Sequence, residues 1–166
     1  MTGFAGIKQY SSSGIVNIMP YFRVKQNSSP AITTSTIFTF DTTENDEFNG
    51  WDGSDEYTIP VSGLWHFVVA LMLNTGGGTE VRVFESAIFV DGTEVSNSSM
   101  TFADPSSGSG NHPGLNIIAT VPCNKGAVIK SGNTGHIDPT SGITMRGGDC
   151  RFFGTMISSG CEPNSF

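Results

Sequence analysis

The chain has 166 residues and a formal net charge of −7, and only 14% of its residues are charged, against roughly 25% in an average soluble domain. Its eight Lys and Arg residues are scattered along the sequence, which argues against binding of nucleic acid or of an anionic membrane surface. No window approaches the ~20 apolar residues of a membrane helix, so no membrane insertion is expected. The length suits one domain with a single core.

Short apolar runs bounded by Gly, Pro, Asn, Asp and Ser recur along the chain and predict strands, because no segment shows an apolar stripe at helical spacing. We expect an N-terminal arm over residues 1–20, a β domain over residues 21–158 and a C-terminal tail over residues 159–166. The expected strands cover residues 15–19, 21–25, 35–40, 56–60, 63–74, 80–92, 93–100, 115–122, 126–132 and 151–158. So many short strands with turns between them predict an all-β sandwich, jelly roll or barrel.

Three long loops interrupt these strands, over residues 41–55, 101–114 and 133–149. The first is acidic, and its candidate calcium ligands are Asp41, Asp46, Asp52 and Asp55. Calcium takes six to eight oxygen ligands, but the loop lacks the spacing of an EF-hand. Two interpretations therefore stay open, a calcium site or a solvated acidic loop, and no other cofactor is expected.

The stretch YTIPVSGLWHF, residues 57–67, is interpreted as a corner between two strands. Pro60 has no N–H and ends the ladder of the first strand, and Gly63 lets the backbone turn without a Cβ penalty. Trp65 and Phe67 then enter the core from one face of the second strand, while His66 points to the other face. Further along, the pair Asp91-Gly92 predicts a tight hairpin turn.

The residues that carry catalytic or metal chemistry elsewhere form no convincing site in this sequence. His66 is expected on a strand and His112 in a loop, and no Gly-x-Ser-x-Gly elbow accompanies them. His136 and Asp138 lie two residues apart and are candidate ligands of one ion, but a transition metal needs more ligands than these. The glycines of residues 75–79 are interpreted as a flexible turn. The chain is therefore not expected to be an enzyme.

Three cysteines, Cys123, Cys150 and Cys161, form no CxxC pair, and their odd number argues against a full disulfide framework. A bridge between Cys150 and Cys161 is one alternative. The other is that the cysteines are free, partly buried thiols.

An ordered aromatic series resembles the signature of the complement C1q globular head, a branch of the tumour necrosis factor-like jelly rolls. The series consists of Phe40, Asp46, Trp51, Tyr57, Gly63, Trp65 and Phe67. AIFVDGTEV resembles the central hairpin of that family, VPCNKGAVIK its Gly-Asp-x-Val strand with Ala127 in place of Asp, and RFFGTMIS its closing strand. The resemblance covers residues 21–158 and implies a two-sheet antiparallel jelly-roll sandwich that packs as a homotrimer.

Two classes of function are compatible with this resemblance. The first is a structural protein of a virus or phage particle, either a capsid decoration (cement) protein or a tail-fibre head, which binds capsid or other virion proteins at the virion surface. The N-terminal stretch lacks the pattern of a signal peptide, and no collagen-like repeat precedes the domain, which favours this class. The alternative is a secreted C1q-like or tumour necrosis factor-like recognition module that binds a receptor or glycan.

Overall fold

The computed structural model describes residues 7–11, 14–33, 36–74, 81–103, 112–134 and 143–159, and these residues contain strands and no helix. The strands are β1 (Ile7–Ser11), β2 (Gly14–Ile18), β3 (Tyr21–Gln26), β4 (Thr42–Asp46), β5 (Tyr57–Thr58), β6 (Gly63–Asn74), β7 (Val81–Val90), β8 (Thr93–Ala103), β9 (Gly114–Cys123), β10 (Val128–Asn133), β11 (Thr144–Met145) and β12 (Cys150–Ser159). The described residues therefore include no helix that is long and apolar enough to cross a membrane.

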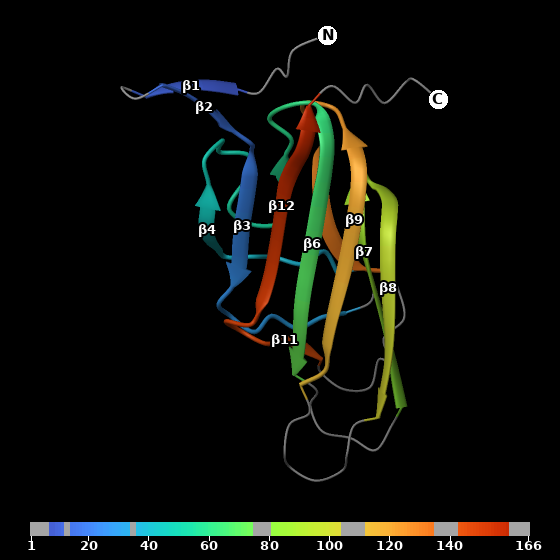
Figure 1. Ribbon diagram of the computed structural model, residues 1–166. Coiled ribbons are helices and arrows are strands. Elements are labelled where there is room, and N and C mark those ends of the chain that lie inside the picture. The colour runs from blue at the N-terminus through green and yellow to red at the C-terminus, as the bar shows by residue number, and fades with distance from the viewer. Residues whose placement is uncertain are drawn as a thin grey trace.

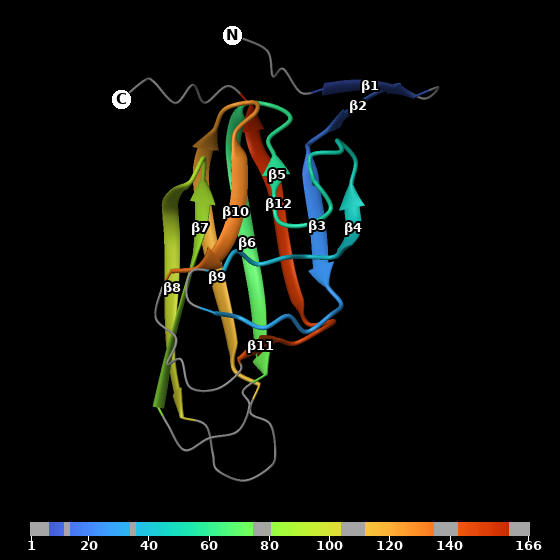
Figure 2. The same ribbon diagram turned by 180° about the vertical axis from the view of Figure 1, so that it is seen from behind.

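Two antiparallel sheets lie face to face and form a jelly-roll sandwich (Figures 1 and 2). The larger sheet runs β9-β6-β12-β3-β4, and β11 pairs with the end of β6. The smaller sheet has the order β5-β10-β7-β8. β1 and β2 form a separate hairpin at the end of the sandwich where β3 begins, and they pair only with each other among the described strands (Figure 1).

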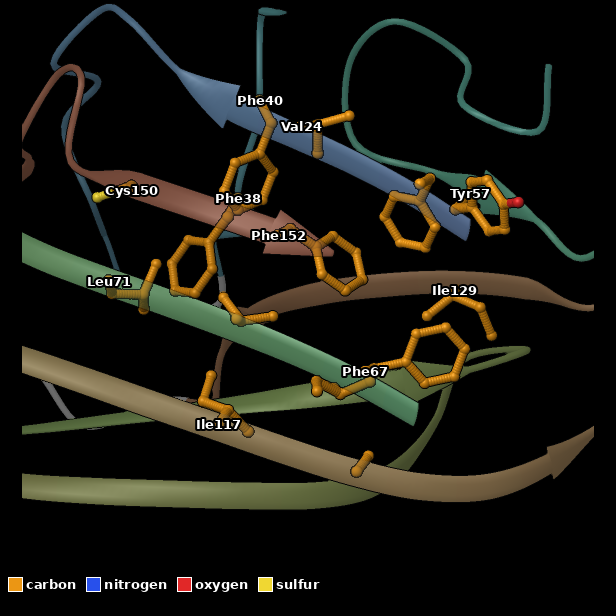
Figure 3. Close-up of a cluster of buried hydrophobic side chains, with 14 of the residues drawn as sticks. Val24, Phe38, Phe40, Tyr57, Phe67, Leu71, Ile117, Ile129, Cys150 and Phe152 are labelled. Atoms are coloured by element: carbon orange, nitrogen blue, oxygen red, sulfur yellow. The ribbon is translucent and has the colours of Figure 1, made fainter. Parts of the chain in front are cut away.

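The core fills the space between the sheets, and its largest fully buried side chains are aromatic (Figure 3). In β6, every second residue from Gly63 to Leu73 is buried, which is the period expected of a strand with one face on the core. Phe22 of the larger sheet stacks on Tyr57 of the smaller sheet with ring centroids 3.8 Å apart. Phe152, on the same sheet as Phe22, meets it edge-on at 5.0 Å, and the contact of Phe22 with Tyr57 joins the two layers.

Two expectations for the first half of the chain were wrong. Residues 36–40 form an extended connection rather than a continuous strand, because their backbone bonds go to scattered partners such as Ser131 and Ser54. Phe38 and Phe40 are nevertheless buried, so the alternating pattern was real while the ladder was not. The acidic loop contains β4, whose charged and polar residues suit an exposed sheet edge. β11 likewise lies within the loop expected over residues 133–149.

Candidate interaction surface

The corner residues connect the two sheets. Pro60 lies between β5 of the smaller sheet and β6 of the larger one, directly after Ile59, whose N–H donates to the carbonyl of Ala127 at 2.9 Å. Gly63 is not among the residues with positive φ, so it is not needed to make the turn. A Cβ atom on Gly63 would instead collide with the backbone oxygen of Ser158 on β12. Gly63 therefore allows a close approach between two strands, which differs from the reason inferred from the sequence.

Trp65 and Phe67 are fully buried, and they hold the corner in place. The indole Nε1 of Trp65 donates to the carbonyl of Val61 at 3.1 Å and ties the start of β6 back to the connection. The rings of Trp65 and Phe67 stack at 5.9 Å, and Tyr57 lies 5.9 Å from Trp65. Burial, and to a smaller extent the charge of Asp46, raises the pKa of the Tyr57 hydroxyl, which therefore stays neutral. These residues form the core, not a binding site.

The four calcium candidates do not converge. Asp46 accepts hydrogen bonds from the N–H groups of Gly50 and Trp51, at 3.2 and 2.8 Å. Asp41 accepts from those of Asn27 and Ser28. Asp55 forms an ion pair with Lys130 at 3.8 Å. Across the described ranges, no three His, Cys, Asp or Glu side chains come together in a way that would hold a metal ion.

Asp52 closes the acidic turn by itself, since its Oδ1 accepts hydrogen bonds from the N–H groups of Ser54, Asp55 and Glu56 at 2.8 to 3.1 Å. Partial burial pushes the pKa of this carboxyl upward, but those three bonds and the nearby Lys130 ammonium outweigh it. The pKa of Asp52 consequently lies below its ordinary value. Asp46 and Asp52 thus cap turns of this loop, as Asx residues commonly do.

The histidines and cysteines are also dispersed. His66 Nδ1 hydrogen-bonds the Thr120 hydroxyl at 2.8 Å on the outer face of the larger sheet. His112 is exposed, whereas His136, Asp138, Cys161 and the glycines of residues 75–79 lie outside the described residues. Cys123 and Cys150 are buried free thiols, so Cys150 is not in a disulfide. Burial, helped by the charge of Asp91, raises the pKa of Cys123 to about 12, and burial raises that of Cys150 as well.

The feature that stands out is the outer face of the larger sheet, which faces the reader in Figure 1. The strand register places Phe153 of β12 beside Val68 of β6, and Val68 beside Ile118 of β9. We call these three residues the apolar row. Ile118 is 56% exposed, and Ile157 and Tyr21 on the same sheet are 47% and 38% exposed. An outward face of this kind is unusual for an antiparallel sheet, whose solvent side is normally polar.

Charged residues border the apolar row on the side of β3 and β4. Arg23 lies beside Phe153 in the register, and its Nε is 2.6 Å from a carboxylate oxygen of Glu44. Lys25 lies 3.7 Å from the other oxygen of Glu44. The face therefore combines an apolar centre with a charged rim, the composition typical of a protein interface.

The sequence contains a signal for the apolar row. Each of its members directly follows a core residue, in the pairs Phe152-Phe153, Phe67-Val68 and Ile117-Ile118. Side chains alternate between faces, so two adjacent apolar residues in a strand predict that both faces of the sheet become covered.

No model of a known protein family matches the chain, and no curated protein matches it. Among solved structures, the chain is similar to the "Globular Domain of Zebrafish Complement 1qA protein" with a TM-score of 0.53 and 16% sequence identity. The match covers 85% of this chain and 99% of the zebrafish domain. The chain therefore has the C1q/tumour necrosis factor-like jelly-roll fold that the aromatic series predicted.

Proposed function

We propose that this chain is a non-enzymatic structural protein of a virus or phage particle, a homotrimeric jelly roll that serves as a capsid decoration (cement) protein or a fibre head at the virion surface. The observation that carries the proposal is the apolar row on the outer face of the larger sheet, in which Ile118 is exposed and Phe153 and Val68 are half-buried. Covering Ile118 alone would contribute on the order of 1 kcal/mol per subunit. The C1q-like fold supports a trimer as the arrangement that covers this face.

Attachment to a particle is the role we propose for residues 1–20. β1 and β2 pair with each other and with no other described strand. An isolated two-stranded hairpin is marginally stable in water, so it gains stability when it lies on another protein surface. A neighbouring capsid or virion protein would provide that surface.

The oligomeric part of the proposal is tested by sedimentation of the purified chain. We expect the wild type to sediment as a trimer and Ile118→Lys to sediment as a folded monomer, because the lysine places a charge in the centre of the apolar row. Val83→Lys is the matched control, since Val83 is 39% exposed but lies on β7 of the smaller sheet. A trimer that survives Ile118→Lys but not Val83→Lys would move the interface to the other sheet.

Association with a particle is tested by centrifuging source material through a density gradient and probing each fraction for this chain. A fixed ratio to a dense particle that persists in high salt supports the proposal, and the ratio distinguishes many-copy decoration from a few-copy fibre head.

The second candidate is a secreted recognition module that binds a receptor or glycan, favoured by the similarity to a complement protein domain. Recovery only as a soluble species of about three chains would support that candidate instead.

A further inference from the structure

Arg151 is the starting point, because its guanidinium differs from those of the other arginines whose side chains are described. Arg23 pairs with Glu44, and Arg146 pairs with Asp149 at 3.0 Å. Arg151 Nε is shielded from solvent and has no hydrogen-bond partner, and no carboxylate in the described part of the chain lies within ion-pair distance of Arg151. Arg151 as a whole is half-buried, but a shielded N–H donor that lacks a partner is costly, so this site favours an incoming hydrogen-bond acceptor.

A cavity lies where that acceptor would enter. It has a volume of about 370 Å³ and opens on the outer face of the larger sheet between β3 and β12. Tyr21 and Phe153 contribute aromatic walls, Thr155 contributes a hydroxyl group and Arg151 contributes a positive charge. Arg23 also lines the cavity, but its charge is paired with Glu44. Phe153 also belongs to the apolar row, so the cavity is continuous with the proposed subunit interface.

The chemistry of the walls selects a carboxylate on an apolar stem. A guanidinium presents parallel N–H groups that match the two oxygens of a carboxylate. The aromatic walls offer apolar surface against which the methylene groups of such a side chain pack. The chain carries 15 Asp and Glu residues against eight Lys and Arg residues, so another copy of it readily supplies such a side chain.

We propose that the cavity between β3 and β12 receives an Asp or Glu side chain of a neighbouring copy of this chain, which pairs with Arg151. The inference rests on the proposed homotrimer and adds to it a specific polar contact. The apolar row supplies the area of the interface, and Arg151 fixes its register, because an unpaired carboxylate or guanidinium penalises any other docking geometry.

The first test compares trimer dissociation constants of the wild type, Arg151→Met and Arg23→Met in low and high salt. Arg151→Met is expected to weaken the trimer at least tenfold in low salt and to remove most of its salt dependence, because a screened charge pair is lost. Arg23→Met is the matched control in the same cavity, since Arg23 already pairs with Glu44 of its own chain. Unchanged dissociation in Arg151→Met would overturn the inference while leaving the trimer intact.

The second test identifies the carboxylate directly. A carbodiimide joins an amine to a carboxylate within contact distance as an amide, with loss of water. Arg151→Lys, mixed from isotopically light and heavy copies, is expected to yield crosslinked peptides that contain one light and one heavy partner. Arg23→Lys should crosslink within one copy, to Glu44. Crosslinks of Arg151→Lys confined to one copy would overturn the inference.

A wild type that stays monomeric in sedimentation would overturn both the trimer and this inference. Titration of that monomer with acetate and with N-acetylneuraminic acid would then test whether the cavity binds the carboxylate of a free ligand. Binding that Arg151→Met abolishes would assign the cavity to a free ligand rather than to a second copy.

Discussion

Glycines in this sandwich answer two different physical needs. Gly92 has a φ of 79° and follows Asp91 with a φ of 50°, the pair of positive values that a tight hairpin between β7 and β8 requires. Gly63 and Gly154 have ordinary backbone angles but no room for a Cβ atom. At Gly154 the added atom would lie 2.5 Å from the Phe22 ring and 2.6 Å from the Phe67 ring. The presence of a glycine in the sequence does not distinguish these two needs, so a turn-forming role was the natural expectation for Gly63.

Because Gly63 allows a close approach of two strands, we expect that adding one methyl group there changes the free energy of unfolding. Gly63→Ala should lower the free energy of unfolding by ~1–3 kcal/mol, because the methyl group meets the backbone of Ser158, which cannot rotate away. Gly114→Ala is the matched control on β9 of the same sheet, where the nearest atom is 3.6 Å from the added Cβ. Urea denaturation measures both variants, and equal midpoints would contradict the close-approach interpretation.

At the scale of the element, the sequence predicted strands best where one face is core. The bounds of β6 agree with the expected residues 63–74, and the Asp91-Gly92 turn joins β7 to β8 as expected. β4 was missed because an edge strand stays polar, so its sequence resembles a loop. β11 was missed because two residues show no period.

We expect the β1–β2 hairpin to serve attachment to a particle and not trimer formation. Deletion of residues 1–18 should leave the trimer intact and remove attachment to the parent particle. The deletion stops at Ile18, because the carbonyl of Pro20 accepts a hydrogen bond from the Met156 N–H at 2.9 Å. Co-sedimentation with particles measures attachment, and deletion of residues 160–166 controls for the loss of a terminus. Particle binding retained by the first variant would contradict the arm hypothesis.

For the molecule as a whole, the aromatic series predicted the fold because its members serve the core. Phe40, Tyr57, Trp65 and Phe67 are all essentially buried, and Asp46 caps the turn before Trp51. The outer face was not predicted residue by residue, since strand register decides which apolar side chains become neighbours. Val68 precedes Phe153 by 85 positions and Ile118 by 50 positions in the sequence, from their residue numbers 68, 153 and 118. Only the pairing of β6 with β12 and with β9 makes these residues neighbours.

Acid stability is the last property that the structure predicts for the whole molecule. The hydrogen bonds to Asp41 and Asp52 outweigh burial and hold the pKa of each carboxyl below 3.8, its ordinary value. A lowered folded-state pKa means that protonation favours the unfolded chain. The stabilisation is therefore complete at neutral pH and is lost as the pH falls below about 4 through the folded-state values.

Asp52→Asn separates this effect from general acid denaturation. The amide oxygen still accepts N–H groups but carries no charge, so the variant should lose less than about 1 kcal/mol at pH 7, since the exposed site is screened by solvent. Its urea midpoint should then fall less steeply than that of the wild type between pH 5 and about pH 3. Glu47→Gln, which removes an exposed carboxylate from the neighbouring turn, should leave the slope unchanged. Parallel profiles for the wild type and Asp52→Asn, measured at one protein concentration, would show that the turn at Asp52 does not contribute to acid sensitivity.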